Sequence, residues 1–366
     1  APKGETTDAG VMVASKDGKY SLKVNRYETK VTNASSNALG GAWFIGSSQS
    51  WAGNWVNRFE YNWTSDHIGG VVTNPDPENT MYNYGTAPGE TLAQAQAREQ
   101  AAIAAWRAWQ ASVDPRFYAA WSINLNDQTR GISASTPGGF TVTEDATSKG
   151  WEIEMSAQPV RNWRITLNGA KSTATRENIG GTNLRAFMNA YDQALKTTAL
   201  GDLRIWWGGA GNETTLLQWN NNVGSEWTLR KLQEGTAVPE LREWRWNLVN
   251  TYDFSTGWLK NVSVGGAIRY QSDVVIGYPP ELSDIPGEIT FDLGSPYKGP
   301  SETDFDLWIG YWRKLGEKVT WIVQLNLRNA FNGNDLIPIS TQPDGTPAGY
   351  RIKPPQTWTL TNTFRF

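Results

Sequence analysis

Apolar and polar residues alternate along many segments of the chain with a period of two. In the segment 319–328, every second residue from Val319 to Leu327 is apolar, and polar residues such as Gln324 and Asn326 stand between them. Successive side chains of a β-strand point to opposite faces, so this pattern predicts a strand with one apolar and one polar face. Equivalent patterns predict about nine strands, at 10–15 (the weakest), 20–24, 151–156, 163–168, 244–254, 262–270, 305–311, 319–328 and 356–366.

Short and long connections alternate between these strands. The short ones are rich in turn residues and suit β-hairpins; they span 16–18, 159–162, 255–260 and 314–318. The long ones are far longer than the connections of compact domains; they span about 36–146, 177–239, 273–303 and 332–355. Barrels of the bacterial outer membrane have short periplasmic turns and long extracellular loops. The alternation of lengths therefore predicts such a barrel.

Two helices are expected inside the long loops. The segment 91–112 is rich in alanine, glutamine and arginine, which favour helices, and a second helix is expected at 184–195. No linker or repeat divides residues 1–366 into independent domains. The predicted fold is all-β, a partial antiparallel transmembrane β-barrel of about nine strands with long extracellular loops that carry short helices.

Composition agrees with a barrel and excludes several other classes. No run approaches the roughly 18 to 20 apolar residues of a membrane-spanning helix, whereas a barrel strand needs only about 10 residues with every second one apolar. The formal net charge is −3 with both signs interspersed, so nucleic acid is not an expected partner. The chain has no cysteine and a single histidine, His67, which argues against zinc sites and Ser-His-Asp chemistry. No cofactor or metal is expected.

The end of the chain carries an aromatic strand. Trp358, Phe364 and Phe366 share one predicted face of QTWTLTNTFRF (356–366), which resembles the closing strand of an outer-membrane barrel. Two further segments resemble strands of TonB-dependent receptors: SKGWEIEMSAQPVRNWRITLNGA (148–170) and WIVQLNLRNAFN (321–332). The chain thus resembles the C-terminal part of the barrel of this family.

The resemblance implies a function and several partners. It implies location in outer-membrane lipid, uptake of a scarce nutrient (an oligosaccharide, a siderophore or a cobalamin-like ligand), and no enzymatic activity. It also implies a 22-stranded barrel, an N-terminal plug domain and contact with the TonB protein through that plug, and it gives Trp358, Phe364 and Phe366 the role of a signal to the barrel-assembly machinery. Neither the plug nor the remaining strands are visible in this sequence. We expect them on the same polypeptide or on a second chain.

Tryptophan is unusually abundant, with 20 residues in the chain, and eleven of them fall in the long loops. Aromatic rings beside amides suit the capture of sugars or aromatic chelators. The candidate ligand-binding residues are Trp206, Trp207, Trp219, Asn220, Trp43, Trp51 and Trp55. The alternative is that the tryptophans pack the loops into a rigid cap.

Polar residues of the alternating strands are expected to face the barrel lumen. They could hold a plug domain through ion pairs and hydrogen bonds, or they could simply line a solvated interior. The residues concerned are Glu152, Glu154, Arg164, Arg245, Arg269, Gln324 and Arg328. Glu152 and Glu154 also have the spacing of a general acid/base pair, but such pairs are ordinary on the wet wall of a barrel.

Two other functions remain open at this stage. A soluble, secreted β-rich protein that binds glycans or mediates adhesion would also be rich in tryptophan and free of cysteine. It would stay monodisperse without detergent. An outer-membrane hydrolase is less consistent with a chain that has one histidine.

Overall fold

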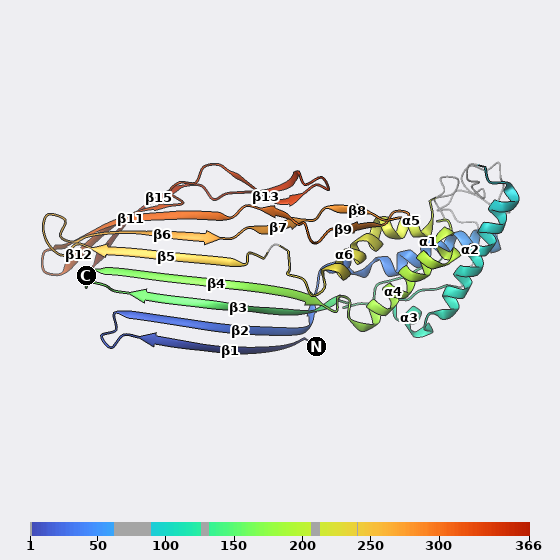
Figure 1. The fold of residues 1–366 in the computed structure, drawn as a ribbon, viewed down its shortest axis with the longest axis horizontal. Helices are drawn as coiled ribbons and strands as arrows, with labels where there is room; N and C mark the ends of the chain where they lie inside the picture. The colour runs from blue at the N-terminus through green and yellow to red at the C-terminus, as the bar shows by residue number, and fades with distance from the viewer. Residues whose placement is uncertain (1, 62–88, 126–131, 206–212, 240) are drawn as a thin grey trace.

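The computed structural model describes residues 2–61, 89–125, 132–205, 213–239 and 241–366 (Figure 1). Within these ranges, nine strands form one antiparallel sheet in which spatial order follows chain order. The strands are β1 (Lys3–Ala14), β2 (Tyr20–Ser35), β3 (Thr143–Ala157), β4 (Trp163–Glu177), β5 (Trp244–Asp253), β6 (Val262–Gln271), β11 (Glu302–Leu315), β12 (Val319–Arg328) and β15 (Thr357–Arg365). The nine predicted strands are confirmed, although most are longer than the alternation alone indicates.

The register of the sheet places the apolar residues of neighbouring strands side by side. Leu167, Leu248 and Ile268 lie opposite one another on β4, β5 and β6, whereas Asn168 and Asn247 pair on the other face. The apolar face is uncovered along much of the sheet. Its exposed large side chains include Val11, Val13, Leu22, Trp151, Trp163, Ile268, Leu307, Ile309, Trp358, Leu360 and Phe364. An apolar surface of this extent marks contact with a partner or a membrane.

The two ends of the sheet differ. At one end, tight turns join β1 to β2, β3 to β4, β5 to β6 and β11 to β12. Gly18 and Gly316 lie in two of these turns at φ 71°, a conformation that glycine adopts without strain. At the other end lie the long segments between hairpins, and Figure 1 shows their helices gathered there.

The long segments fold into helices and small strands. The helices are η1 (Ala38–Ala42), α1 (Phe44–Tyr61), α2 (Leu92–Ser112), α3 (Pro115–Ala120), α4 (Gly181–Thr197), η2 (Ala199–Asp202), α5 (Thr215–Trp219), η4 (Asn220–Gly224) and α6 (Ser225–Gln233). The small strands are β7 (Val274–Gly277), β8 (Pro280–Leu282), β9 (Ile289–Phe291), β10 (Tyr297–Gly299), β13 (Leu336–Thr341) and β14 (Pro347–Ile352). No helix in the described ranges is long and apolar enough to cross a membrane.

Both predicted helices are present, and a third long one was not predicted. α2 begins at Thr91, whose hydroxyl accepts from the Gln94 N–H while the Gln94 side chain accepts from the Thr91 N–H, a capping box. α4 covers the predicted 184–195. α1, α2 and α4 have 18, 21 and 17 residues.

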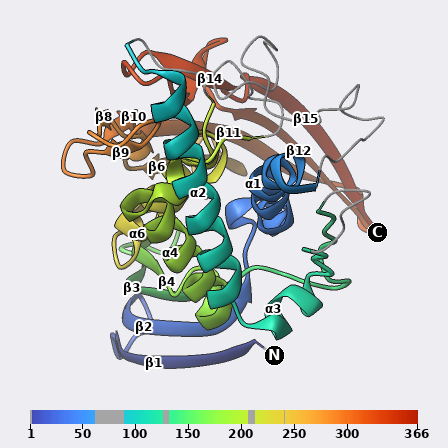
Figure 2. The same ribbon diagram turned by 90° about the vertical axis from the view of Figure 1, so that its right-hand side faces the viewer.

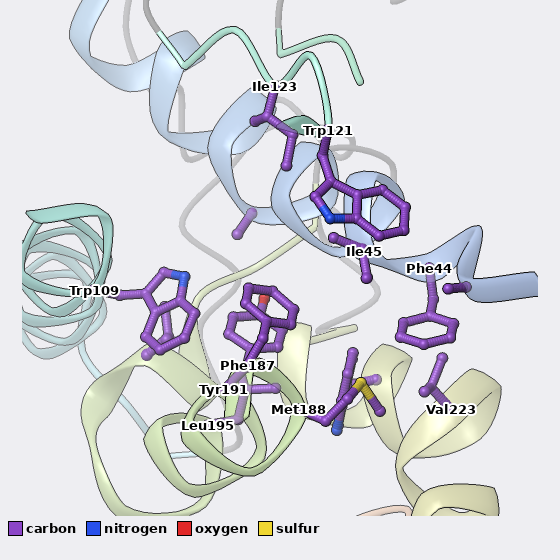
Figure 3. Close-up of a cluster of buried hydrophobic side chains, with 14 of the residues drawn as sticks. Phe44, Ile45, Trp109, Trp121, Ile123, Phe187, Met188, Tyr191, Leu195 and Val223 are labelled. Atoms are coloured by element: carbon purple, nitrogen blue, oxygen red, sulfur yellow. The ribbon is translucent and has the colours of Figure 1, made fainter. Parts of the chain in front are cut away.

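The main hydrophobic core lies among the helices and not under the sheet. We call the helices from η1 to α6, with the described loops between them that lie outside the main sheet, the helical cap. Trp55, Trp106, Trp219 and Trp227 are all fully buried within it, and Figure 3 shows part of this core, with side chains from several helices turned toward one another. Viewed along the strands in Figure 2, the sheet forms an open curve from β1 to β15 and the cap stands in front of it.

Candidate functional site

Three of the four predicted ligand-binding tryptophans that the structure describes lie inside the core of the cap. Trp55 and Trp219 are fully buried, Asn220 is 1% exposed and Trp51 is 6% exposed. These four residues pack in the core of the cap, and their contact with a ligand stays a prediction. Trp43 is 47% exposed, so ligand contact there stays a prediction. Trp206 and Trp207 lie outside the described residues.

A cavity of about 750 Å³ opens in the cap between the C-terminal end of α2, α3 and the first turns of α4. This volume falls in the range typical of small-molecule sites, roughly 300–1,000 Å³. One wall is aromatic and is formed by Trp109, Phe117, Trp121, Phe140 and Phe187. Polar groups at the cavity come from Ser112, Asp114, Arg116 and Asn183.

The local sequence explains how the aromatic wall is built. Asp114 caps α3 by accepting from the Arg116 N–H at 2.8 Å, and Pro115 occupies the first helical position. Phe117 of α3 and the C-cap residue Trp121 then follow one turn apart. Phe117 stacks on Phe187 of α4 at 4.5 Å between ring centroids.

A charged pair stands at this cavity beside the aromatic wall. Arg116 donates to both carboxylate oxygens of Asp114, at 3.0 and 2.5 Å for the Oδ2 contacts. This bonding lowers the pKa of Asp114 to about 2, so both groups are charged at neutral pH. The Arg116 side chain is 91% exposed; its Nε and Nη2 are bound to Asp114, which leaves its Nη1 to donate to an anionic group. The cavity therefore suits a small molecule that combines ring or apolar surface with a polar or negatively charged group.

The polar residues at this cavity, Phe117 and Phe187 were not among the predicted site residues. Two signals point to them in retrospect. The Asp-Pro pair at 114–115 marks a helix start, and the spacing of Phe117 from Trp121 matches that of Phe187 from Tyr191.

The seven polar strand residues predicted to face the lumen share one face of the sheet. Glu154 and Arg269 occupy the same paired row through Asn168 and Asn247. Arg269 forms an ion pair with Asp306 at 3.1 Å, and Arg164 pairs with Asp253 at 3.2 Å. The other residues on this face are Glu152, Arg245, Gln324 and Arg328. Their contact with a plug domain stays a prediction.

The aromatic residues of the last strand lie on the apolar face. Trp358 is opposite Leu327 and Phe364 is opposite Trp321, while Phe366 is 97% exposed. The role of these three residues in barrel assembly stays a prediction. No group of three or more histidine, aspartate or glutamate residues in the described ranges could hold a metal ion.

A buried carboxyl group sits deep in the cap. Glu99 of α2 is fully buried and its Oε1 accepts from the Trp55 indole N–H. Its Oε2 has no hydrogen-bond partner among the described residues. Burial raises the pKa of Glu99 to about 7, although the Trp55 bond and the positive charge of Arg204 oppose the shift.

The cap is expected to lose stability as the pH rises from about 4.5 to about 7. Below pH 4.5 Glu99 is protonated in both the folded and the unfolded cap; between 4.5 and 7 the unfolded chain releases the proton first, which favours unfolding by about 3 kcal/mol. Hydrogen exchange of α2 at pH 5 and at pH 8 measures this difference in the stability of the cap. Glu99→Gln is expected to remove the difference, since it keeps an acceptor for Trp55 and cannot ionise. An equal pH response in both proteins would contradict this assignment.

Comparison with known proteins gives similarity only among solved structures. No family model matches the chain, and no curated protein does. The ferric yersiniabactin uptake receptor FyuA from Yersinia pestis has a TM-score of 0.42 and 8% identity, over 100% of this chain and 30% of that one. The ferric-catecholate import receptor Fiu from E. coli K12 has a TM-score of 0.40 and 13% identity, over 99% and 28%. The ferripyoverdine receptor of the Pseudomonas aeruginosa outer membrane has a TM-score of 0.39 and 10% identity, over 100% of this chain and 27% of that one. The chain thus spans less than a third of each of these proteins.

Proposed function

We propose that this chain forms part of the barrel of a TonB-dependent outer-membrane receptor that takes up a scarce nutrient. The observation that carries the proposal is the sheet itself. It has an uncovered apolar face and a polar face, with tight turns at one end and a folded cap at the other. Lipid would cover the apolar face, and the polar face would line the lumen.

The remaining parts of the receptor would complete the sheet. Within the described residues, β1 and β15 each pair with one neighbour only, and in lipid the unpaired backbone groups of both edges need partners. Further barrel strands and a plug, on the same polypeptide or on a second chain, would supply them. The plug would lie against the polar face and connect the receptor to TonB.

Fractionation tests the membrane assignment. The protein that contains this chain, expressed in a Gram-negative host, is expected in the outer-membrane fraction and should require detergent for extraction. Uptake of its nutrient should stop in a strain without TonB. A protein that is secreted and stays monodisperse without detergent would support the glycan-binding alternative instead.

Ligand capture is assigned to the aromatic cavity of the cap. The groups that contact the ligand would be the stacked ring of Phe117 and the guanidinium of Arg116. We expect the site to take a small molecule with apolar or ring surface and an anionic group, and ferric siderophores fit this description better than neutral oligosaccharides.

The substitution Phe117→Ala is expected to weaken ligand binding about ten-fold, because it removes the aromatic surface that Phe117 presents at the cavity, together with its contact to Phe187. Calorimetry on the detergent-solubilised protein, with a panel of ferric siderophores, cobalamin and maltooligosaccharides, measures the effect. Phe331→Ala is the matched control, since Phe331 is exposed and lies outside the cavity. If the two variants bound every ligand with equal affinity, the capture site would not be at this cavity.

A further inference from the structure

A row of alternating cationic and aromatic residues crosses four strands on the apolar face. Arg26 of β2, Trp151 of β3, Lys171 of β4 and Trp244 of β5 lie directly opposite one another in the sheet. The guanidinium of Arg26 lies 5.8 Å from the centroid of the Trp151 ring, and the Lys171 ammonium lies 5.0 Å from that of Trp244. These are cation–π distances.

The row marks a sharp change in polarity along the strands. Toward the tight turns, three successive rows on the same face are apolar on β2, β3 and β4; they contain Val24, Ile153 and Gly169, then Leu22, Met155 and Leu167, then Tyr20, Ala157 and Ile165. Three steps of two residues span about 20 Å along a strand. Toward the cap, the next row holds Glu28, Lys149 and Thr173. The cation–aromatic row thus lies at one edge of an apolar band.

Two adjacent cavities open at this edge and share Trp151 and Lys171. The one nearer the cap has a volume of about 260 Å³, and its charged lining residues are Arg26, Lys149, Lys171 and Glu243. The one nearer the tight turns has a volume of about 180 Å³ and is lined mainly by apolar groups, among them Val24, Ile153 and Trp246. Trp246 lies flat against Gly169, where a Cβ would come within 2.1 Å of the ring.

The charge balance of the cavity nearer the cap favours an anion. Glu243 is paired with Lys171 at 2.9 Å, and the nearby Glu28 is paired with Lys30 at 2.9 Å. Arg26 and Lys149 have no acidic partner within 4.0 Å among the described residues. Arg26 and Lys149 therefore leave two uncompensated positive charges at the cavity nearer the cap, and the adjacent cavity is apolar.

We propose that this pair of cavities binds a phosphorylated lipid of the surrounding membrane. Arg26, Lys149 and Lys171 hold the phosphate, and an acyl chain lies in the apolar cavity against Ile153 and Trp246. The site goes beyond nutrient uptake and rests on the proposed membrane location. If the protein were absent from the outer-membrane fraction, the proposed function would be wrong. If the inserted protein showed no lipid preference, only the proposed lipid site would be wrong.

Native mass spectrometry of the purified protein tests the proposal, with phosphatidic acid as the phosphate-bearing probe and phosphatidylcholine as its comparison. The protein is expected to retain phosphatidic acid selectively. The triple variant Arg26→Gln, Lys149→Gln, Lys171→Gln is expected to lose about a hundred-fold in affinity, since each of the three cations near a membrane surface contributes about five-fold. The matched control is Lys23→Gln, Arg245→Gln, Arg328→Gln, which removes equal charge from the opposite face and is expected to retain the lipid.

Three results would overturn the proposal. The first is equal retention of both lipids by the unmodified protein, and the second is an equal loss in the control variant, which would indicate general charge attraction. The third is displacement of the lipid by excess inorganic phosphate, which would indicate a site for free phosphate to which the apolar cavity adds nothing.

Discussion

Lysine in place of Leu248 is expected to destabilise the membrane-inserted protein by about 2–4 kcal/mol, the cost of a lysine on the lipid face near the middle of a bilayer. Leu248 lies near the middle of β5, in a paired row with Leu167 and Ile268. No charge of opposite sign is available in that row. Reversible folding of the protein that contains this chain into phosphatidylcholine vesicles, followed over a denaturant series, measures the change.

Asn247→Lys is the matched control because Asn247 is the preceding residue of the same strand and points to the other face. It pairs with Asn168 and Arg269, in the same row as Glu154, so an added lysine meets a polar and hydrated wall. Its cost is expected to stay below about 1 kcal/mol. If Asn247→Lys cost more than Leu248→Lys, the polar face would be the one in contact with lipid and the proposed orientation would be wrong.

Alanine in place of Asp192 is expected to cost the cap about 3–5 kcal/mol, because it breaks a buried ionic network by removing one partner. Asp192 of α4 is 6% exposed and accepts from the Trp219 indole N–H and from Lys196, both at 3.0 Å. Lys196 also donates to Glu288 of the neighbouring segment. The substitution leaves a buried indole N–H unsatisfied and weakens the tie between α4 and α5. Hydrogen exchange of α4 and α5 should speed up by two orders of magnitude or more, while the strands keep their protection.

A surface ion pair in the same cap provides the comparison. Glu226 of α6 pairs with Arg230 one turn later, with 43% of the Glu226 side chain exposed. Such a pair contributes about 0.5 kcal/mol or less. Glu226→Ala should therefore leave cap exchange nearly unchanged, and similar effects of the two substitutions would show that the Asp192 network adds no stability.

The sheet could be predicted from the sequence because one physical cause acts at every strand. A sheet with one apolar and one polar face needs alternation, and a run such as Val319 to Leu327 records it directly. β1 was the weakest prediction and is longer than predicted: residues 3–9, KGETTDA, are polar or small on both faces. Only the pairing of β1 with β2 reveals them as a strand.

The cap could be predicted only in part because tertiary contacts decide its structure. α2 has strong helix formers and a capping box, so local rules suffice. α1 contains glycine, serine and asparagine, which are poor helix formers, and the burial of Phe44, Ile45 and Trp55 offsets that weakness. The same limit applies to the tryptophans. Trp43 and Trp55 belong to the same loop. Trp43 is about half exposed and Trp55 is fully buried, and this difference depends on their neighbours in space, which the sequence does not reveal.

The agreement between spatial order and chain order in the main sheet has a consequence for biogenesis. Each strand pairs with the one before it and the one after it, apart from the small strands that lie between β6 and β11 and between β12 and β15. The wall can therefore be lengthened by one hairpin at a time, each new hairpin docking on the last free edge. In the proposed barrel, all intervening segments emerge at the same rim, so each would cross the bilayer once with its own hairpin, and no strand would have to be inserted later between two that are already paired.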